Sequence, residues 1–234
     1  MGQYVDLLRS LPRVRRDVRA RAAARDRDVV HVAKQYGADY FDGDRKYGYG
    51  GYRYDGRWQQ VARDIVHNYG LDKQGGYETV SYKKYGAAPS ILDIGCAKGF
   101  LVYDLLQDGF CHPYGLDISY YAVVRRPHPA VVGRLHLGTA DILPFPDQSF
   151  DLVLSINTLH NLPRQRIIWA LQEMRRVSRG HMFVQVDSYR TPEEKALFED
   201  WVLTAEWHGY PDEWLALFAE AGYDGDYCWT IVEA

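Results

Sequence analysis

The chain has 234 residues, of which 47% are hydrophobic and 25% charged, so it can form one globular domain or a core that carries a smaller cap. Its formal net charge of −3 gives no general attraction to nucleic acid, so a nucleic-acid partner is not favoured. No run approaches the roughly 18 apolar residues of a membrane span, and the start lacks the apolar core of a signal peptide, so we expect a cytoplasmic protein without a membrane partner.

Residues 9–27 carry eight arginines. Val14, Val18 and Ala22 recur at four-residue intervals, which predicts a single helix with one narrow apolar stripe. Pro12 suits the first turn of that helix. The arginines either form a surface for an anionic partner or are the solvated face of a surface helix, and the second interpretation is favoured. A second helix is predicted at 28–35.

The next segment is unusually rich in aromatic residues. Residues 40–57 combine many glycines with rings and charges, which is typical of a binding loop. A helix is predicted at 58–69. We expect residues 1–75 to form a cap or lid over a core of residues 76–234, with Tyr52 and Arg57 reaching the substrate. Ten of the 19 tyrosines fall within residues 36–85: 36, 40, 47, 49, 52, 54, 69, 77, 82 and 85.

From residue 89 onward, short apolar runs alternate with helical patterns. Strands are predicted at 90–94, 113–116, 134–137, 150–156 and 181–186, with a strand-like tail at 227–232. Helices are predicted at 101–107, 162–177 and 211–221. This alternation predicts an α/β fold with a doubly wound, mostly parallel sheet that is covered by helices on both faces.

A ligand site is expected where the first of these strands ends. The run Ile91–Phe100 is a strand that ends in an acid, followed by a glycine-bearing turn into a helix. A glycine turn alone is a weak signal, because dinucleotide sites share it. Asp93 sharpens it, since a carboxylate suits a cationic ligand better than a pyrophosphate. Asp117 ends the second strand 24 positions later, where an acid can bind ribose hydroxyls.

Three segments in order resemble the motifs of class I S-adenosylmethionine (SAM)-dependent methyltransferases, over about residues 89–186. The segments are Asp93-x-Gly95-x-Ala97-x-Gly99, Gly115-Leu-Asp117-Ile-Ser, and the run from Gly138 through Asp141 to Val153. The resemblance implies a Rossmann-like core with SAM as cofactor and S-adenosylhomocysteine as product. Ala97 replaces the usual middle glycine, and we expect its single methyl to be tolerated.

The resemblance also implies roles for individual residues. The turn would hold the methionine end of SAM, Asp117 its ribose and Asp141 the adenine amino group. Asn157 and Leu159 would line the sulfonium. Ile118 would lie against the adenine, although plain packing explains it equally well. The implied cofactor residues are Asp93, Gly95, Cys96, Ala97, Lys98, Gly99, Phe100, Asp117, Ile118, Ala140, Asp141, Ile142, Asn157 and Leu159.

The acceptor is expected above the carboxyl ends of the fourth and fifth strands. His160 is the favoured general base, because an unperturbed imidazole pKa of about 6.5 suits proton removal near neutrality. A histidine that only caps a helix or binds SAM is an equal alternative. Asp187 is predicted to orient His160 or bind an acceptor hydroxyl. Arg190 is a candidate for a substrate carboxylate or phosphate, with a surface role as the alternative. His208 and Glu206 are weaker candidates.

Two further segments, 40–58 and 186–190, resemble bacterial methyltransferases of sugar and secondary-metabolite pathways. This implies a small-molecule acceptor. Cationic residues of the cap loop could bind a polar, anionic one, such as a nucleotide sugar, a phospho or phosphonate compound, or a carboxylate-bearing natural-product precursor; these residues are Arg45, Lys46, Arg53 and Arg57. O-methylation is favoured because His160 offers a base. The alternatives are an RNA or protein methyltransferase that uses the arginine-rich helix, or a non-catalytic SAM-binding regulator.

The remaining expectations concern metals and assembly. The three cysteines, Cys96, Cys111 and Cys228, are far apart in the sequence. Their spacing fits neither a disulfide framework nor a metal site, and it suits a reducing compartment. We expect a monomer or homodimer without a metal.

Overall fold

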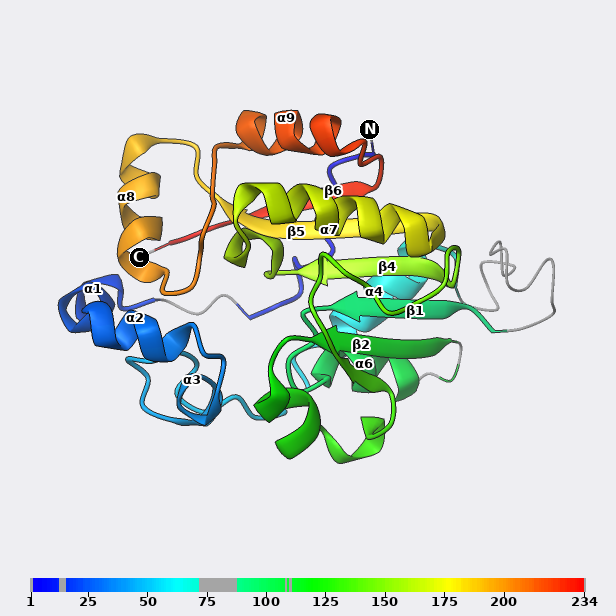
Figure 1. The fold of residues 1–234 in the computed structure, drawn as a ribbon, viewed down its shortest axis with the longest axis horizontal. Coiled ribbons are helices and arrows are strands. Elements are labelled where there is room, and N and C mark those ends of the chain that lie inside the picture. The colour runs from blue at the N-terminus through cyan, green and yellow to red at the C-terminus, as the bar shows by residue number, and fades with distance from the viewer. Residues whose placement is uncertain (1, 13–15, 72–87, 108, 110, 234) are drawn as a thin grey trace.

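The computed structural model describes residues 2–12, 16–71, 88–107, 109 and 111–233. Its centre is a sheet of six parallel strands in the order β3-β2-β1-β4-β5-β6 (Figure 1). The strands are β1 Ser90–Ile94, β2 His112–Asp117, β3 Leu135–Leu137, β4 Phe150–Ile156, β5 Ser178–Ser188 and β6 Asp226–Ile231. The predicted doubly wound α/β fold is confirmed. The order of the strands reverses between β1 and β4, since later strands are added outward on both sides of this pair. Such a switch in strand order opens a crevice at the carboxyl ends of the strands.

Helices cover both faces of the sheet because alternate strand residues point to opposite sides. On one face, α7 Arg164–Val177 and α9 Pro211–Ala221 pack against Leu92 and Ile94. On the other face, α4 Gln59–Asn68 and α6 Phe100–Gln107 pack against Ile91. The near-continuous apolar sequence of β1 and β4 follows from this burial on both sides.

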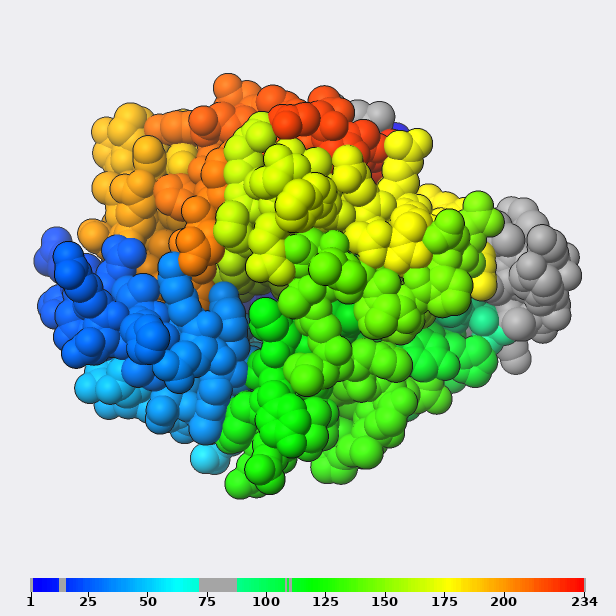
Figure 2. Space-filling view, in the orientation of Figure 1, coloured from blue at the N-terminus to red at the C-terminus, as the bar shows by residue number. Residues whose placement is uncertain are grey.

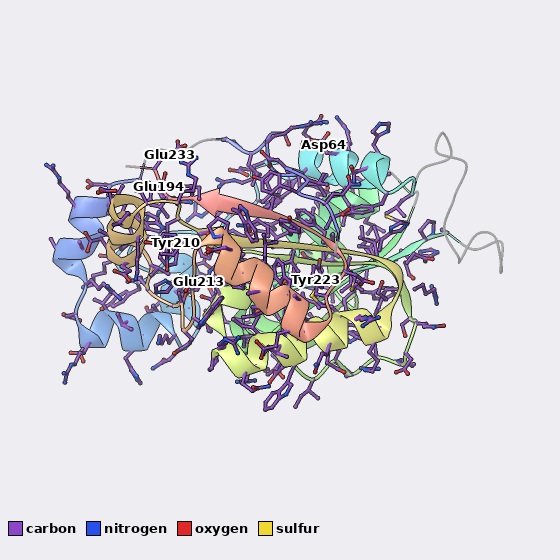
Figure 3. All side chains as sticks on the ribbon, turned by 90° about the horizontal axis from the view of Figure 1, so that it is seen from above. Asp64, Glu194, Tyr210, Glu213, Tyr223 and Glu233 are labelled. Carbon is purple, nitrogen blue, oxygen red and sulfur yellow. The ribbon has the colours of Figure 1, made fainter. Side chains whose placement is uncertain are left out.

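Helix α9 has the bounds that the sequence predicts. Pro211 occupies its first turn, and the backbone N–H of Tyr210 donates to the Glu213 carboxylate at 2.8 Å, which satisfies a group at the helix start (both labelled in Figure 3). Gly222 ends the helix in a left-handed conformation. Three short helical turns complete the core: η1 Tyr121–Arg125, η2 Pro129–Val131 and η3 Leu159–Asn161.

The first described residues belong to the core. The backbone N–H of Val5 donates to the Tyr227 carbonyl at 2.9 Å, and the N–H of Tyr227 donates to the Gln3 carbonyl at 3.0 Å, so this segment extends the β6 edge of the sheet. Leu7 is buried beside α4. The domain division predicted at 75/76 lies outside the described residues, as do Tyr77, Tyr82 and Tyr85, and it stays a prediction.

A separate layer, here called the cover (residues 16–57), lies at the carboxyl ends of the strands (Figure 1). It contains α1 Val18–Ala24, α2 Arg27–Ala33 and α3 Ala38–Asp42. Helix α1 packs on α8 Pro192–Trp201, a helix that the sequence analysis did not predict. In Figure 2 the blue cover meets the yellow-orange segment around α8 and the green segment that follows β2.

The prediction of one helix over 9–27 is wrong. Helix α1 begins only at Val18, because the Asp17 side chain accepts from the Ala20 N–H at 3.0 Å and caps the helix. Asp26 caps α2 in the same way, through the Val29 N–H at 2.7 Å. Pro12 lies outside any helix, and Val14 lies outside the described residues. The two aspartates therefore divide the arginine-rich segment into separate elements.

Candidate active site

Two cavities open between the cover and the carboxyl ends of the strands. The smaller has a volume of about 350 Å³ and the larger about 860 Å³. Tyr40, Tyr49, Asn157 and Asn161 line both, so the cavities meet at these four side chains. Asn157 is the first residue after β4 and has a φ of 56°, which turns the chain sharply at this junction.

The smaller cavity gathers the three motifs that the sequence analysis identified. Its floor consists of the ends of β1 and β2 and the turn 138–140 that follows β3. Residues 157–163 after β4 form one side, and rings of the cover form the roof. From the expected cofactor residues, the following line this cavity: Gly95, Ala97, Asp117, Ile118, Ala140 and Asn157.

Gly95 is required by the geometry of the first turn. Its φ is +84°, and a Cβ added there would lie 1.9 Å from the Thr158 Oγ1. Ala97 also has a positive φ, of 50°, which an alanine adopts at some energetic cost. Its backbone N–H donates to the Asp117 carboxylate at 2.8 Å, which holds the turn against the end of β2.

Two acids lie buried beneath this turn. Burial, together with a smaller contribution from the charge of the nearby Asp117, raises the pKa of Asp93 to about 7. Burial also raises the pKa of Asp117, although N–H groups of Ser119 and Ala97 donate to its carboxylate at 2.8 Å each and oppose the shift. A cationic ligand nearby would stabilise the ionised form of both acids. The cradle therefore fits SAM, whose ammonium and sulfonium groups are positive and whose ribose offers two hydroxyls.

The structure places Asp141 differently from the expectation. Its carboxylate is not part of the cavity wall, and it forms a bidentate ion pair with Arg166 at 2.6 and 2.8 Å. Hydrogen bonds from Arg166 hold the pKa of this carboxyl below its usual value. Arg166 itself lines the cavity, so Asp141 orients an arginine of the cavity wall. Ile142 follows it and is 72% exposed.

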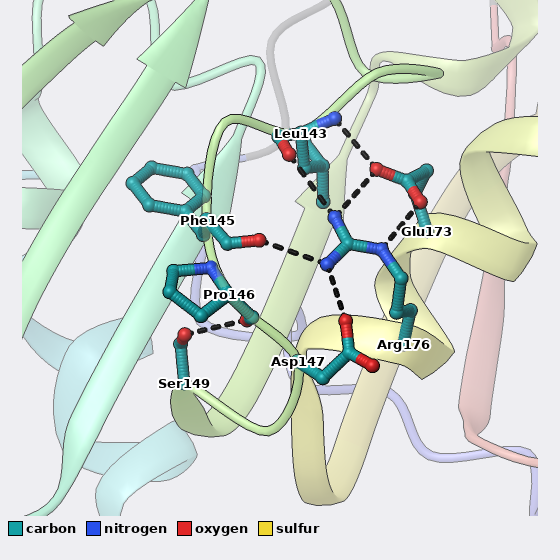
Figure 4. Close-up of polar contacts among 7 residues, drawn as sticks. All are labelled: Leu143, Phe145, Pro146, Asp147, Ser149, Glu173 and Arg176. Carbon is teal, nitrogen blue, oxygen red and sulfur yellow. Dashed lines mark hydrogen bonds and ion pairs between the residues drawn. The ribbon is translucent and has the colours of Figure 1, made fainter.

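The loop behind this turn is fixed from α7 by Arg176 (Figure 4). Its guanidinium donates to the carbonyls of Phe145 at 2.8 Å and Leu143 at 3.0 Å and pairs with Asp147 at 2.8 Å. Glu173 accepts from the Leu143 N–H at 2.7 Å and also binds Arg176. These bonds attach the segment between the turn 138–140 and β4 to α7.

Lys98 joins the cofactor turn to the cover. Its ammonium lies 2.7 Å from both carboxylate oxygens of Asp42 and 2.8 Å from the Tyr52 carbonyl. Phe100 stacks on the ring of Tyr52 at a centroid distance of 4.8 Å and lines the larger cavity. These two predicted cofactor residues thus attach the cover to the core and do not line the smaller cavity.

Three other predicted cofactor residues also lie behind its wall. Cys96 is buried against Gly115, where a Cβ would lie 2.5 Å from the cysteine Sγ. Gly99 lies under Val131 and Leu135. Leu159 is fully buried in the core. We expect these residues to act through the shape of the turn.

The larger cavity contains both predicted catalytic residues, His160 and Asp187. The His160 ring is buried, and its Nδ1 lies 3.4 Å from the backbone N–H of Asp187. Burial lowers the pKa of the imidazole, with the Asp187 charge opposing the shift and His208 adding to it. The ring is therefore neutral at pH 7. Because Nδ1 accepts a hydrogen bond from the Asp187 N–H, the ring proton is assigned to Nε2.

The predicted substrate residues divide into two groups. Tyr52 and Arg57 line the larger cavity, and Arg57 also binds Asp55 at 2.9 Å. Arg190 is exposed and pairs with Glu194 on α8, away from both cavities (Glu194 is labelled in Figure 3). The interpretation of Arg190 as a surface residue is the one that the geometry favours.

Two weaker candidates from the loop after α8 have separate positions. His208 binds the Tyr189 hydroxyl at 2.9 Å and lines neither cavity. Glu206 lines the smaller cavity and pairs with Lys34 at 2.6 Å.

Several lining residues were missed by the sequence analysis. Arg16, Arg21 and Trp201 line the larger cavity, and Tyr40, Tyr49 and Asn161 lie at or near the junction. The excess of arginines and rings in residues 9–57 was the available signal. Which of them face inward depends on how α1 packs on α8, and local sequence does not record that contact.

The fold and the smaller cavity together define a class I SAM-dependent methyltransferase domain. In agreement, residues 92–184 match the sequence family described as a methyltransferase domain. SAM is the cofactor that this domain implies.

Three relatives match parts of the chain. A mitochondrial arginine hydroxylase of Rattus norvegicus is 33% identical over 79 residues, which are 32% of this chain and 23% of that protein. A 2-methyl-6-phytyl-1,4-hydroquinone methyltransferase of Synechocystis sp. is 27% identical over 166 residues, 67% of this chain and 50% of that protein. A fatty-acid O-methyltransferase of Mycolicibacterium smegmatis is 35% identical over 115 residues, which are 46% of this chain and 41% of that protein. The chain thus spans half or less of the length of these relatives.

Among solved structures, the fold is similar to that of a putative sarcosine dimethylglycine methyltransferase from Galdieria sulphuraria. The TM-score is 0.51 at 17% identity, and the match covers 71% of this chain and 59% of that one. This likeness supports the fold only. In the described part of the chain, no helix has the length and apolar character that crossing a bilayer requires.

Proposed function

We propose that this protein catalyses SAM-dependent methylation of a small, polar, anionic metabolite, with oxygen as the favoured methylated atom. One observation carries the proposal: the cofactor-sized cavity and a larger, cation-lined cavity meet at Tyr40, Tyr49, Asn157 and Asn161. A junction of this kind brings a donor and an acceptor into line, which is the main contribution of an enzyme to a displacement reaction. SAM, when bound, supplies a methyl group on a positively charged sulfur.

The cover supplies rings at this junction. Tyr40 and Tyr49 contact one another at a centroid distance of 5.3 Å, and Phe41 stacks on Tyr49 at 5.7 Å. Aromatic faces attract cations and exclude water. These rings therefore suit a position beside a sulfonium, and they support the role of the cover as a lid.

We assign the handling of the acceptor proton to His160. The ring is neutral, and the neighbouring Asp187 stabilises the imidazolium that forms when a proton is taken up. As the ring lies, Nδ1 faces the Asp187 N–H at 3.4 Å, so accepting a proton from the cavity requires the ring to turn over. That long contact is weak enough to exchange.

The relatives give this proposal partial support. Two of them are named for methyl transfer to small molecules, a hydroquinone and a fatty acid. The third is named as an arginine hydroxylase, so the domain alone does not fix the reaction. The cation-lined cavity is the feature that favours an anionic small molecule.

The test is turnover with methyl-labelled SAM and a panel of nucleotide sugars, phosphorylated compounds and carboxylates, with S-adenosylhomocysteine measured by mass spectrometry. We expect acceptor-dependent product. His160→Gln should lower turnover by about 10²- to 10⁴-fold with unchanged SAM binding, whereas His31→Gln, at an exposed position on α2, should leave both unchanged. SAM binding without product from any acceptor would favour the regulator instead. Product formed only on RNA, with steep salt dependence, would favour the macromolecular alternative.

A further inference from the structure

The outer wall of the larger cavity contains a concentrated group of positive charges. Arg16, Arg21 and Arg45 all surround the indole of Trp201, with guanidinium carbons 5.3, 4.6 and 5.2 Å from the ring centroid. We call these four residues the arginine–tryptophan cluster. They come from the start of the cover, from α1, from the loop after α3 and from α8, and all four line the larger cavity.

The cluster is held in place by backbone carbonyls. Arg21 donates to the Lys46 carbonyl at 3.3 Å and to the Gly48 carbonyl at 3.0 Å, and Arg45 also donates to the Gly48 carbonyl. A Cβ on Gly48 would lie 2.2 Å from the Tyr40 carbonyl oxygen, so only glycine fits at this point. Carbonyls orient the guanidinium groups but leave their charge unneutralised.

Within the described part of the chain, none of the three arginines has an ion pair with a carboxylate. Burial, together with the like charge of Arg45, lowers the pKa of Arg21 to about 10. Burial also lowers the pKa of Arg45, with Arg16 contributing. Like charges that are this close disfavour one another unless an anion lies between them.

Arg16 gives an independent sign of a missing partner. Its Nη1 atom is buried and has no hydrogen-bond partner among the described residues. A buried donor without an acceptor is destabilising, and more so when it carries charge. A bound ligand can supply the missing hydrogen-bond acceptor for such a group.

The charge of the whole cavity points the same way. Six cationic side chains line it against two acidic ones, although the chain as a whole has a net charge of −3. Of the two acids, Asp17 already caps α1. A cleft of one sign in a protein of the opposite sign concentrates counter-charged ligands.

We propose that the arginine–tryptophan cluster binds a phosphate or diphosphate group of the acceptor. A carboxylate needs one guanidinium for a bidentate pair, whereas three converging guanidinium groups match the greater charge and the additional oxygens of a phosphate. The cluster lines the larger cavity and not the smaller one, so we assign the anion to the acceptor and not to SAM. Only the identity of the anion as part of the acceptor rests on the proposed function; anion binding itself does not.

The test is calorimetric titration of the full chain with inorganic pyrophosphate, with and without saturating SAM. We expect saturable binding that Arg21→Gln and Arg45→Gln each weaken by about tenfold or more, the effect of losing a charge-assisted hydrogen bond. Arg16→Gln should also weaken it, because the buried Nη1 of Arg16 has no hydrogen-bond partner among the described residues. Arg63→Gln, at an exposed position on α4, removes the same charge and should change nothing.

Other results would overturn the proposal. These are a folded protein that binds no pyrophosphate, binding that all three cluster variants leave intact, or preferential binding of a dicarboxylate such as malonate. An RNA oligonucleotide that binds more tightly than pyrophosphate, with binding that the cluster variants abolish, would overturn the proposal in favour of a nucleic-acid partner. A SAM titration of the same samples separates this from the proposed function, since SAM binding should persist in every cluster variant.

Discussion

Replacing Asp93 by asparagine tests the buried acids beneath the cofactor turn. The pKa of this carboxyl rises from 3.8 to about 7 in the folded protein, chiefly through burial and also through Asp117. The folded protein therefore holds a proton between about pH 4 and pH 7 that the unfolded chain has released. Stability from the protonated form is present at low pH and is lost as the pH rises through 7.

The size of the effect follows from the shift. For a folded pKa of about 7, the free energy of unfolding falls by about 1.4 kcal/mol between pH 6 and pH 8. In a protein of this length that is a change in Tm of roughly 3–5 °C. Asparagine does not titrate. The free energy of unfolding of Asp93→Asn, relative to that of the wild type, should therefore rise by about 1.4 kcal/mol between pH 6 and pH 8. Comparison with the variant removes the contribution of the histidines, which titrate in both proteins.

The assay is denaturant or thermal unfolding of both proteins at pH 6, 7 and 8. Asp39→Asn, at an exposed position on α3, is the control and should run parallel to the wild type. Saturating SAM should reduce the difference between wild type and Asp93→Asn, because a cation near the carboxylate favours its ionised form. Parallel curves for wild type and Asp93→Asn would refute the reasoning.

Two further predictions concern the turn and its attachment to the cover. Gly95→Ala should destabilise the protein by about 2 kcal/mol and weaken SAM binding, because the new methyl group meets Thr158 and the residue has a positive φ. Gly180→Ala, where a Cβ meets no atom within 4 Å, should have little effect in the same unfolding and binding assays. Equal effects of the two substitutions would contradict the steric argument. Lys98→Met should expose the cover to limited proteolysis several-fold faster, because the half-buried Asp42 loses its 2.7 Å partner. Lys195→Met removes an exposed ion pair with Glu199 at 3.8 Å on α8 and should leave the cleavage rate unchanged. A cleavage rate that Lys98→Met also leaves unchanged would mean that the Lys98–Asp42 pair does not hold the cover.

Much of the core could be predicted because its signals are local. The strands at 90–94 and 150–156 are buried on both faces and therefore read as continuous apolar runs, and their observed bounds match. The helix at 211–221 begins with proline and ends before glycine, and it also matches. The glycine turn after β1 was predictable for the same reason, since Gly95 and Asp117 lie at or directly after a strand end.

The cover was less predictable because contacts between distant segments decide it. The regular spacing of apolar residues in 9–27 indicated one helix, but Asp17 and Asp26 are stronger as caps than as interior helix residues. Helix α8 was missed although it forms the partner of α1. Trp201 and Arg16 are 185 positions apart in the sequence and meet only through that packing.

The measurement that tests the central claim most directly is calorimetric titration of the purified protein with SAM, beside Asp117→Ala. We predict saturable binding to the wild type. In the variant it should be weaker by roughly 10- to 100-fold, because an ionised carboxylate no longer accepts from the ribose. Thermal melting of both proteins shows that the variant is folded. A folded wild type that binds no SAM, or binding that Asp117→Ala leaves unchanged, would contradict the assignment of the smaller cavity.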